Sequence, residues 1–166
     1  QAGRVLKRQD YIQIAIRNAE FIRANLYHNG RLLHSYKNGN AKISGLLEDY
    51  TYLGLGLLEL YQVTLDAKWI LWALELAETI AKHFVDKQGG FFSTADDAET
   101  LIVRPKNYFD SPMPSENAAT AELLLRLSRY TDNRDWENLA VKTLQTMTEA
   151  MRKQPNGFAS LLCVLD

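Results

Sequence analysis

The feature of this sequence that most constrains its fold is an alternation of two kinds of helical pattern. Segments 10–26, 66–84 and 133–152 carry apolar residues every three or four positions, which predicts amphipathic helices with one buried face. Segments 44–62 and 115–130 are apolar on nearly all sides, and helices of that kind are buried all round. We therefore expect two layers, with the apolar helices inside and the amphipathic helices outside.

The alternation is also a repeat with an offset of 67 residues. Trp69 and Trp136 differ by that number (136 − 69), and so do Phe91 and Phe158 (158 − 91). Each unit is a buried helix, a turn, an amphipathic helix and a longer loop. A simple bundle of five helices is the alternative, but a bundle does not predict a second class of helix that is apolar on all sides. We predict an all-α protein of helical hairpins, with one domain at 1–166, units at 44–110 and 111–166, and an outer helix at about 10–26 before them.

The long loops before the two apolar helices are expected to form small β-hairpins. One is "GRLLHSYKNGNAKI", and the other is "GGFFSTADDAETLIVRPK", whose β-prone runs are residues 91–94 and 101–104 with turn residues between them. Because both loops lead into a buried helix, they should lie at the same end of the layers. Elaborated loops carry function more often than the elements they connect, so we expect a site at this end.

Two glycines interrupt the first apolar helix. Gly54 and Gly56 would each cost about 1 kcal/mol relative to alanine inside a helix. We predict that both positions admit a close neighbour.

The bulk composition excludes several classes of function. A net charge of −1 offers no electrostatic basis for binding nucleic acid or an anionic membrane, and no apolar run approaches the ~20 residues of a membrane span. The single Cys163 excludes an intrachain disulfide and a cysteine metal cluster, and it fits a reducing, cytoplasmic location. His28, His34 and His83 lack metal-ligand spacing. We expect neither a metal nor a cofactor.

The polar candidates for a site share one place, the first turn of an apolar helix or the loop that leads into it. They are Glu48, Asp49, Tyr50, Arg104, Lys106, Tyr108, Asp110, Ser115, Glu116 and Asn117. Asp49 and Glu116 are repeat equivalents (116 − 49 = 67). Neighbouring helix axes lie ~8–10 Å apart, so these carboxylates could reach the ~5–9.5 Å separation of glycosidase acid/base pairs. The two basic residues could bind an anionic group.

Each candidate also has a structural interpretation. Ser115 is an expected helix N-cap, and Asp10 is another at the start of the first helix. An acid at Glu48 is the usual response to the helix macrodipole. The two basic residues could simply pair with the acids of the "DDAE" turn.

Three segments together resemble the C-terminal half of the YyaL / spermatogenesis-associated protein 20 family, also called DUF255. They are "GLLEDYTYLGLGLLELYQVTLDAKW", "FVDKQGGFFSTADD" and "RPKNYFDSPMPSENAATAELLLRL", and the match covers roughly residues 10–165. The resemblance implies a thioredoxin-like domain followed by an (α/α)6 toroid, as in N-acylglucosamine 2-epimerases and six-hairpin glycosidases. The thioredoxin-like part is not in this sequence. Six units of 67 residues need about 400 residues, so 166 residues hold about two and a half hairpins of an incomplete toroid.

The family pattern reads close to "RPK…D.A.PSGNS" and "G.L.DYA". By position it marks a set of residues at the rim of the toroid pocket: Asp49, Tyr50, Arg104, Lys106, Asp110, Ser115 and Asn117. Glu116 stands where the pattern has glycine and Pro112 where it has alanine, which weakens Glu116 as a family acid.

From this pattern we expect a carbohydrate site in the toroid mouth of the parent protein. Asp49 and Asp110 would be the catalytic carboxylates, while Tyr50 and Tyr108 would stack on a sugar face. The remaining rim residues would bind hydroxyls or an anionic group: Arg104, Lys106, Ser115 and Asn117. The fragment alone is expected to be inactive, because half a toroid lacks the opposite wall of the pocket.

The alternative is a non-catalytic helical scaffold or partner-docking domain. The expected partners are a sugar or sugar acid, the missing part of the same toroid, and a second copy bound through exposed helices. A redox role has no residue to carry it, because Cys163 stands alone.

Overall fold

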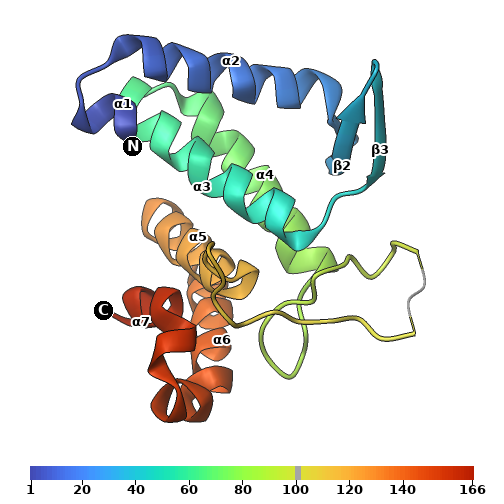
Figure 1. Ribbon diagram of the computed structural model, residues 1–166, viewed down its shortest axis with the longest axis vertical. Helices are drawn as coiled ribbons and strands as arrows, with labels where there is room; N and C mark the ends of the chain where they lie inside the picture. The colour runs from blue at the N-terminus through green and yellow to red at the C-terminus, as the bar shows by residue number, and fades with distance from the viewer. Residues whose placement is uncertain (100–101) are drawn as a thin grey trace.

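The computed structural model describes residues 1–99 and 102–166 of the chain, which are mainly helical (Figure 1). Its helices are α1 (Ala2–Val5), α2 (Gln9–Asn25), α3 (Leu47–Thr64), α4 (Ala67–His83), α5 (Glu116–Thr131), α6 (Arg134–Lys153), the short 3-10 helix η1 (Pro155–Phe158) and α7 (Ala159–Leu165). The strands are β1 (Tyr27–His28), β2 (Arg31–Lys37) and β3 (Asn40–Ser44). The prediction of an all-α protein with a small hairpin is confirmed.

All five predicted helices are present as α2 to α6. The largest difference is at the start of α3, which begins at Leu47 rather than at residue 44. Ser44 belongs instead to β3, where it pairs with Leu33 of β2. The strand ladder therefore takes the residues that the apolar pattern alone extended into the helix.

Side chains cap three of these helices. Ser115 Oγ accepts a hydrogen bond from Ala118 N, which confirms its predicted role at the start of α5. Asp66 caps α4 and Asn133 caps α6 in the same way. The predicted N-cap at Asp10 is wrong, because Asp10 lies in the first turn of α2.

The first predicted β-hairpin is confirmed. β2 and β3 are antiparallel, and Lys37 pairs with Asn40 across the turn Asn38–Gly39. Both turn residues have positive φ, 52° and 78°, as the two-residue Asn-Gly hairpin turn requires.

The second predicted hairpin is not formed by the residues that the structure describes. No strand occurs at 91–94 or 102–104, and residue 101 of the predicted run lies outside the described residues. A backbone hydrogen bond joins the first run to the residue just after the second, from Ser93 N to Pro105 O at 2.8 Å. Backbone hydrogen bonds to other segments, such as Phe92 N to Phe84 O at 2.8 Å, and side-chain hydrogen bonds hold the rest of this loop, so its β propensity is overridden by tertiary contacts.

The inner helices α3 and α5 lie against each other, and each carries an outer helix. Thr51 and Thr120 hydroxyls are 2.8 Å apart between α3 and α5. A Cβ at Gly54 would lie 2.7 Å from Leu123 Cδ2, so the predicted close approach is confirmed there. At Gly56 the prediction is wrong, because a Cβ would meet nothing within 4 Å.

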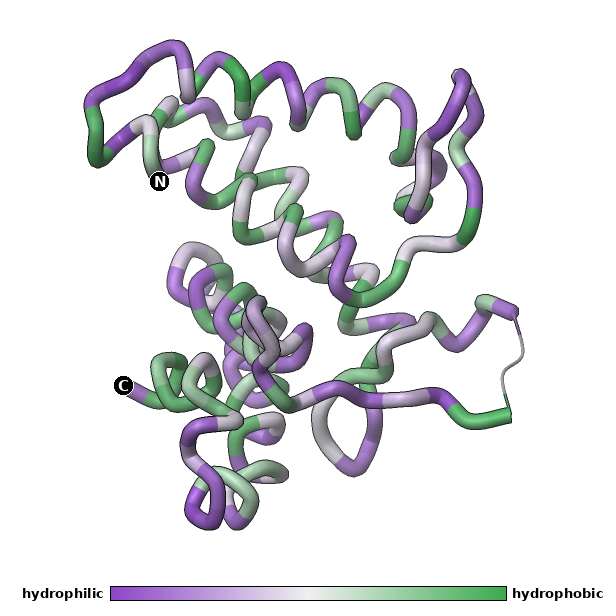
Figure 2. Tube along the Cα trace, viewed as in Figure 1, coloured by the Kyte–Doolittle hydropathy of each residue, from purple (hydrophilic) through white to green (hydrophobic). Residues whose placement is uncertain are grey.

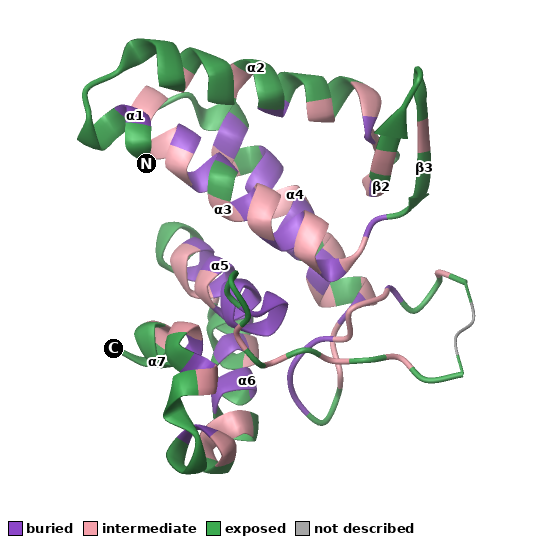
Figure 3. Cartoon of the chain, in the orientation of Figure 1, coloured by how far each residue is buried: buried purple, intermediate pink, exposed green. Residues whose placement is uncertain are grey.

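The buried side chains form a larger cluster over α3, α4 and α5 and a smaller one over α5, α6 and α7. Along α3 only Gly56 is exposed, whereas α2 buries only Ala19 (Figure 3). Figure 2 shows the corresponding mixture of hydrophilic and hydrophobic residues along α2. In the described part of the chain, no helix combines the length and apolar character needed to cross a membrane.

Candidate functional site

The candidate site lies where the two inner helices begin. Glu48 and Asp49 are in the first turn of α3, and Glu116 is the first residue of α5. A groove of about 570 Å³ runs between α2 and α3, and its polar end is formed by Glu48, Asp49 and Tyr52. Met113 from the preceding loop lines the groove as well.

Glu116 is an acidic side chain in a nearly buried place. It is 7% exposed, and its carboxylate accepts a hydrogen bond from Ser93 Oγ. Burial raises the pKa of Glu116 above its usual value, and the charge of Glu48 adds to the rise, while the Ser93 hydroxyl opposes it. A carboxyl group in such surroundings keeps its proton at higher pH than an exposed one, as a general acid must.

Tyr52 lines the groove within the electrostatic influence of this acid. Its hydroxyl donates to Pro114 O at 2.5 Å. Burial raises the pKa of Tyr52, and the charges of Glu48, Glu116 and Asp110 raise it further. The phenol therefore stays neutral beside three carboxylates. Sequence reasoning missed Tyr52, although it lies four residues after Glu48 and so on the same helix face.

The two predicted catalytic carboxylates are held by backbone N–H groups. Asp49 Oδ2 accepts from Leu46 N at 2.7 Å and lies 2.9 Å from His34 Nδ1. The hydrogen bond to Asp49 raises the pKa of His34. These contacts close the first turn of α3.

Asp110 has the same character in the loop before α5. Its two carboxylate oxygens accept from Ser115 N at 2.8 Å and from Ser160 N at 2.7 Å. Asp110 therefore joins the start of α5 to α7, and a ligand would have to compete with both bonds.

Tyr50 and Asn117 are repeat equivalents (117 − 50 = 67) with similar roles. The Tyr50 hydroxyl, fully buried, accepts from Leu32 N at 2.9 Å. Asn117, also fully buried, accepts from Phe91 N at 2.7 Å and donates to Phe91 O at 3.0 Å and Asn107 O at 2.9 Å. Tyr50 joins α3 to strand β2, Asn117 joins α5 to the loop before it, and neither lines the groove.

Arg104 binds backbone carbonyls. Its Nη2 donates to Thr94 O at 2.5 Å and to His83 O at 3.2 Å, and the guanidinium lies 4.2 Å from the centroid of the Phe92 ring. Arg104 therefore holds the long loop in place of the strand ladder that was expected there.

Lys106 and Tyr108 hold the same loop from its C-terminal half. Lys106 forms an ion pair with Asp86 and donates to Gly89 O at 3.1 Å. Tyr108 donates to the same carbonyl at 3.2 Å, and burial raises its pKa. The expected pairing of the basic residue with the "DDAE" acids does not occur for Lys106.

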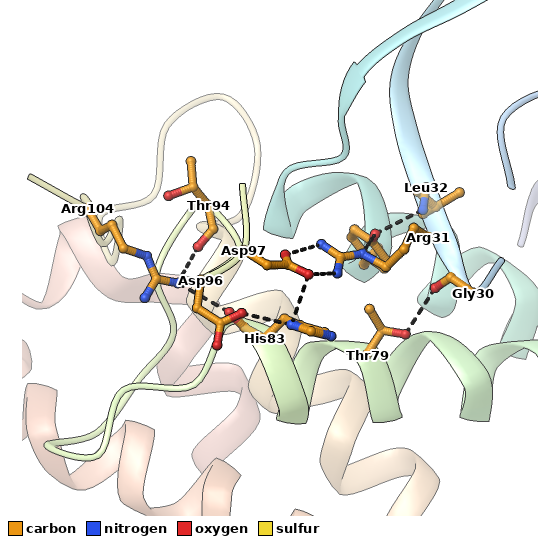
Figure 4. Close-up of polar contacts among 10 residues, drawn as sticks. Gly30, Arg31, Leu32, Thr79, His83, Thr94, Asp96, Asp97 and Arg104 are labelled. Atoms are coloured by element: carbon orange, nitrogen blue, oxygen red, sulfur yellow. Dashed lines mark hydrogen bonds and ion pairs between the residues drawn. The ribbon is translucent and has the colours of Figure 1, made fainter. Parts of the chain in front are cut away.

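A second polar cluster joins this loop to the β-hairpin (Figure 4). His83 Nδ1 lies 2.8 Å from Asp96 Oδ1 and 3.5 Å from Asp97 Oδ2. Arg31 binds both oxygens of Asp97, at 2.6 and 2.8 Å, and lowers the pKa of that carboxyl. One atom from each of His83, Asp96 and Asp97 lies within 4.8 Å of the others, a set that could in principle ligate a cation. The Arg31 fork already occupies Asp97, so we assign the cluster to a network of ion pairs.

The structure thus divides the predicted residues into two groups. Glu48 and Asp49 line the groove together with Tyr52, and Glu116 lies near enough for the charge of Glu48 to raise its pKa. The other group holds loops and helix ends: Tyr50, Arg104, Lys106, Tyr108, Asp110, Ser115 and Asn117.

Similarity to known proteins gives the family. No protein-family model matches the chain. The human protein named spermatogenesis-associated protein 20 is 35% identical over an alignment of 175 residues, which covers 98% of this chain. The mouse protein of that name is 33% identical with the same coverage. The chain matches, over nearly its whole length, a segment of the proteins named spermatogenesis-associated protein 20.

The match covers only part of these relatives. The chain spans 22% of the length of the human and mouse proteins. An uncharacterised protein of Caenorhabditis elegans is 26% identical over 163 residues, which is again 22% of its length. The family resemblance seen in the sequence is therefore confirmed, for a segment of a longer protein type.

Proposed function

We propose that this chain forms one wall of a small-ligand site in a longer family protein, and that the ligand is a carbohydrate or a sugar acid. The proposal includes the whole fold suggested by the repeat, a two-layered toroid of helical hairpins to which this chain contributes about two and a half. In such a fold the ends of the inner helices surround a common mouth.

The observation that carries the proposal is the state of Glu116. It is a nearly buried carboxyl with a raised pKa, beside a second carboxylate, Glu48, and a neutral phenol, Tyr52. Sugar-processing sites need one protonated and one ionised carboxyl together, and sugar-binding sites combine carboxylates with aromatic rings. A groove that is mainly apolar with a few polar groups at one end is also the usual form of a small-ligand site.

Within this proposal Glu116 and Glu48 take the acid/base role. Asp49 and Asp110 remain at or beside the mouth, but their backbone hydrogen bonds favour a positioning role, in which they fix the starts of α3 and α5. Asn117 and Ser115 would orient the same turn without touching the ligand.

A partner-docking domain is the second candidate. The observation that favours it is the apolar surface of α2, where Ile14 and Phe21 are exposed. A docking domain needs no protonated acid at the mouth, so the two candidates differ in what Glu116 does.

The test uses a full-length family protein that contains this segment. Its binding to a panel of neutral sugars and sugar acids is measured by calorimetry, with the variants Glu116→Gln and Glu48→Gln and the exposed control Glu137→Gln. We expect a sugar or sugar acid to bind, and each mouth variant to weaken binding at least tenfold while the control leaves it unchanged. Melting curves establish that each variant is folded. If no sugar binds, or if the three variants behave alike, the proposal is wrong.

A further inference from the structure

Three turns of the chain have the same unusual conformation. Lys7, Leu65 and Asp132 have left-handed backbones, with φ of 52°, 56° and 53°. Each residue stands directly before the N-cap residue of an outer helix, which is α2, α4 and α6 in turn. For Leu65 and Asp132 the turn joins an inner helix to its outer partner.

The turn at Lys7 is also preceded by a helix, the four-residue α1. α2 and α4 both have 17 residues. Their first residues, Gln9 and Ala67, differ by 58 (67 − 9), and the same offset relates Lys7 to Leu65 (65 − 7). On this offset α1 corresponds to the last turn of the inner helix α3. We infer that α1 is the end of a further inner helix, that the rest of this helix precedes Gln1 in the parent protein, and that it occupies the groove between α2 and α3.

The α2 side of the groove has the residues of a hairpin interface. Ala15, Ala19 and Ile22 line the groove. Adding 58 to each number gives Ala73, Ala77 and Ile80 of α4, which have the same residue types. Those three are fully buried in the core that α4 shares with α3. α2 therefore carries the face with which α4 covers its inner helix, but of its three residues only Ala19 is buried.

The α3 side has the residues of an interface between two inner helices. α5 contacts α3 through Thr120, Leu123 and Arg126. Subtracting 67 gives Leu53, Gly56 and Glu59 of α3, which should contact an earlier inner helix in the same manner.

These three positions lie on the groove and on its continuation. Leu53 and Gly56 line the groove of about 570 Å³. Gly56 and Glu59 line a further pocket of about 210 Å³, which α1 borders through Gly3 and Arg4. The hollow at Gly56, where a Cβ meets nothing within 4 Å, lies between the two.

Glu59 of α3 forms ion pairs with the helices on both sides of it. Arg126 of α5 reaches Glu59 of α3 at 3.1 Å, and Arg4 of α1 reaches the other oxygen of Glu59 at 3.7 Å. α1 therefore already contacts α3 at the position expected for the end of an earlier inner helix. Because α3 has 18 residues and α1 only four, about 14 residues of the inferred helix would lie before Gln1, or roughly 20 Å at 1.5 Å per residue.

The inferred helix would follow the groove from α1 toward Glu48 and Asp49, and so it would add a wall to the candidate site. This inference does not rest on the ligand proposed above. It concerns only what covers α2 and α3.

The test compares this chain with a full-length family protein that contains it. Gly56→Leu fills open space in this chain and replaces a glycine by a better helix former, so its melting temperature should stay the same or rise. In the full-length protein the leucine would meet the seated helix, and the same substitution should lower the melting temperature by several degrees. The matched control is Gly54→Ala, which meets Leu123 and should lower both.

Hydrogen exchange gives a second measurement that needs no substitution. The backbone amides of α2 should exchange at least tenfold more slowly in the full-length protein than in this chain. Equal exchange in both proteins, or a Gly56→Leu effect of the same sign in both, would overturn the inference. It would also be overturned if this chain sediments as a dimer that Gly56→Leu dissociates while the full-length protein tolerates the leucine, since a second copy would then be the occupant.

Discussion

At the scale of single residues, two neighbours in the sequence have opposite roles. Glu116 and Asn117 both start α5, and both are buried. Asn117 uses its amide oxygen and both amide hydrogens on backbone groups, so it is fully satisfied. Glu116 is held by a hydroxyl and disfavoured as an anion. Asn117 is therefore a structural residue, whereas Glu116 has the properties of a reactive acid.

Replacing Asn117 by alanine should therefore destabilise the protein strongly. The change leaves the backbone groups of Phe91 and Asn107 without partners, at a cost of about 3 kcal/mol. The matched control is Asn107→Ala, because Asn107 is exposed and contributes its carbonyl to this contact, which alanine retains. Urea unfolding measures both variants. Equal losses would show that the Asn117 bonds do not hold the loop.

The pH dependence of stability should report Glu116. Its pKa is raised in the folded protein, so the folded state holds the proton more tightly than the unfolded chain. The stabilisation from this proton is complete below the ordinary value of 4.5 and is lost as pH rises through the folded-state pKa. Stability of the native protein should fall relative to Glu116→Gln over that range. Unfolding curves at several pH values test this, with Glu137→Gln as an exposed control; parallel curves for the native protein and Glu116→Gln would contradict it.

At the scale of elements, the turn between helices is the most repeated part of the structure. The left-handed residue is never glycine, since Lys7, Leu65 and Asp132 occupy the three positions. A left-handed backbone costs roughly 1–2 kcal/mol for a residue with a Cβ. The turns therefore carry strain that the packing of the paired helices offsets.

Relieving this strain should stabilise the protein. Leu65 is 77% exposed, so Leu65→Gly removes little buried surface and should raise the free energy of unfolding by about 0.5 kcal/mol. Leu71, which is 57% exposed inside α4, is the control, and Leu71→Gly should cost about 1 kcal/mol. Thermal unfolding resolves the opposite signs. A loss for both variants would mean that the Leu65 turn is not strained.

At the scale of the whole molecule, the described chain is well packed around α3 and α5 and sparsely packed at α2 (Figure 3). Two complete hairpins, α3 with α4 and α5 with α6, meet through their inner helices. The α2 end has the groove and a row of exposed apolar side chains. Such a surface favours association with another protein surface.

We expect this chain by itself to self-associate through the outer face of α2. Ile14 and Phe21 are exposed there, and Ile14→Lys with Phe21→Lys should shift the protein to monomer. Val141 is exposed on α6, so Val141→Lys serves as the control and should leave association unchanged. Sedimentation over a hundredfold range of concentration measures the effect, and a monomer at every concentration would contradict the expectation.

Much of the fold could be predicted from the sequence because its patterns are local. The apolar spacing located α2 to α6, and Ser115 was identified as a cap because a hydroxyl before a helix satisfies free N–H groups. The Asn-Gly turn likewise specified the hairpin of β2 and β3. The prediction of the second hairpin was wrong because side chains such as Arg104 and Asn117 bind the backbone groups that a β-ladder would have used.

The candidate site was only partly predictable, because the roles of its residues depend on contacts that are not local in the sequence. The sequence by itself determined the helices, their two classes, the repeat, and the end of the layers at which polar residues collect. Only the tertiary structure decided which of those residues hold backbone groups and which are desolvated, since hydrogen bonding and burial depend on neighbours that are distant in the chain. Asp49 and Glu116 occupy equivalent positions in the repeat. Asp49 nevertheless accepts a hydrogen bond from Leu46 N, whereas Glu116 is buried and has a raised pKa.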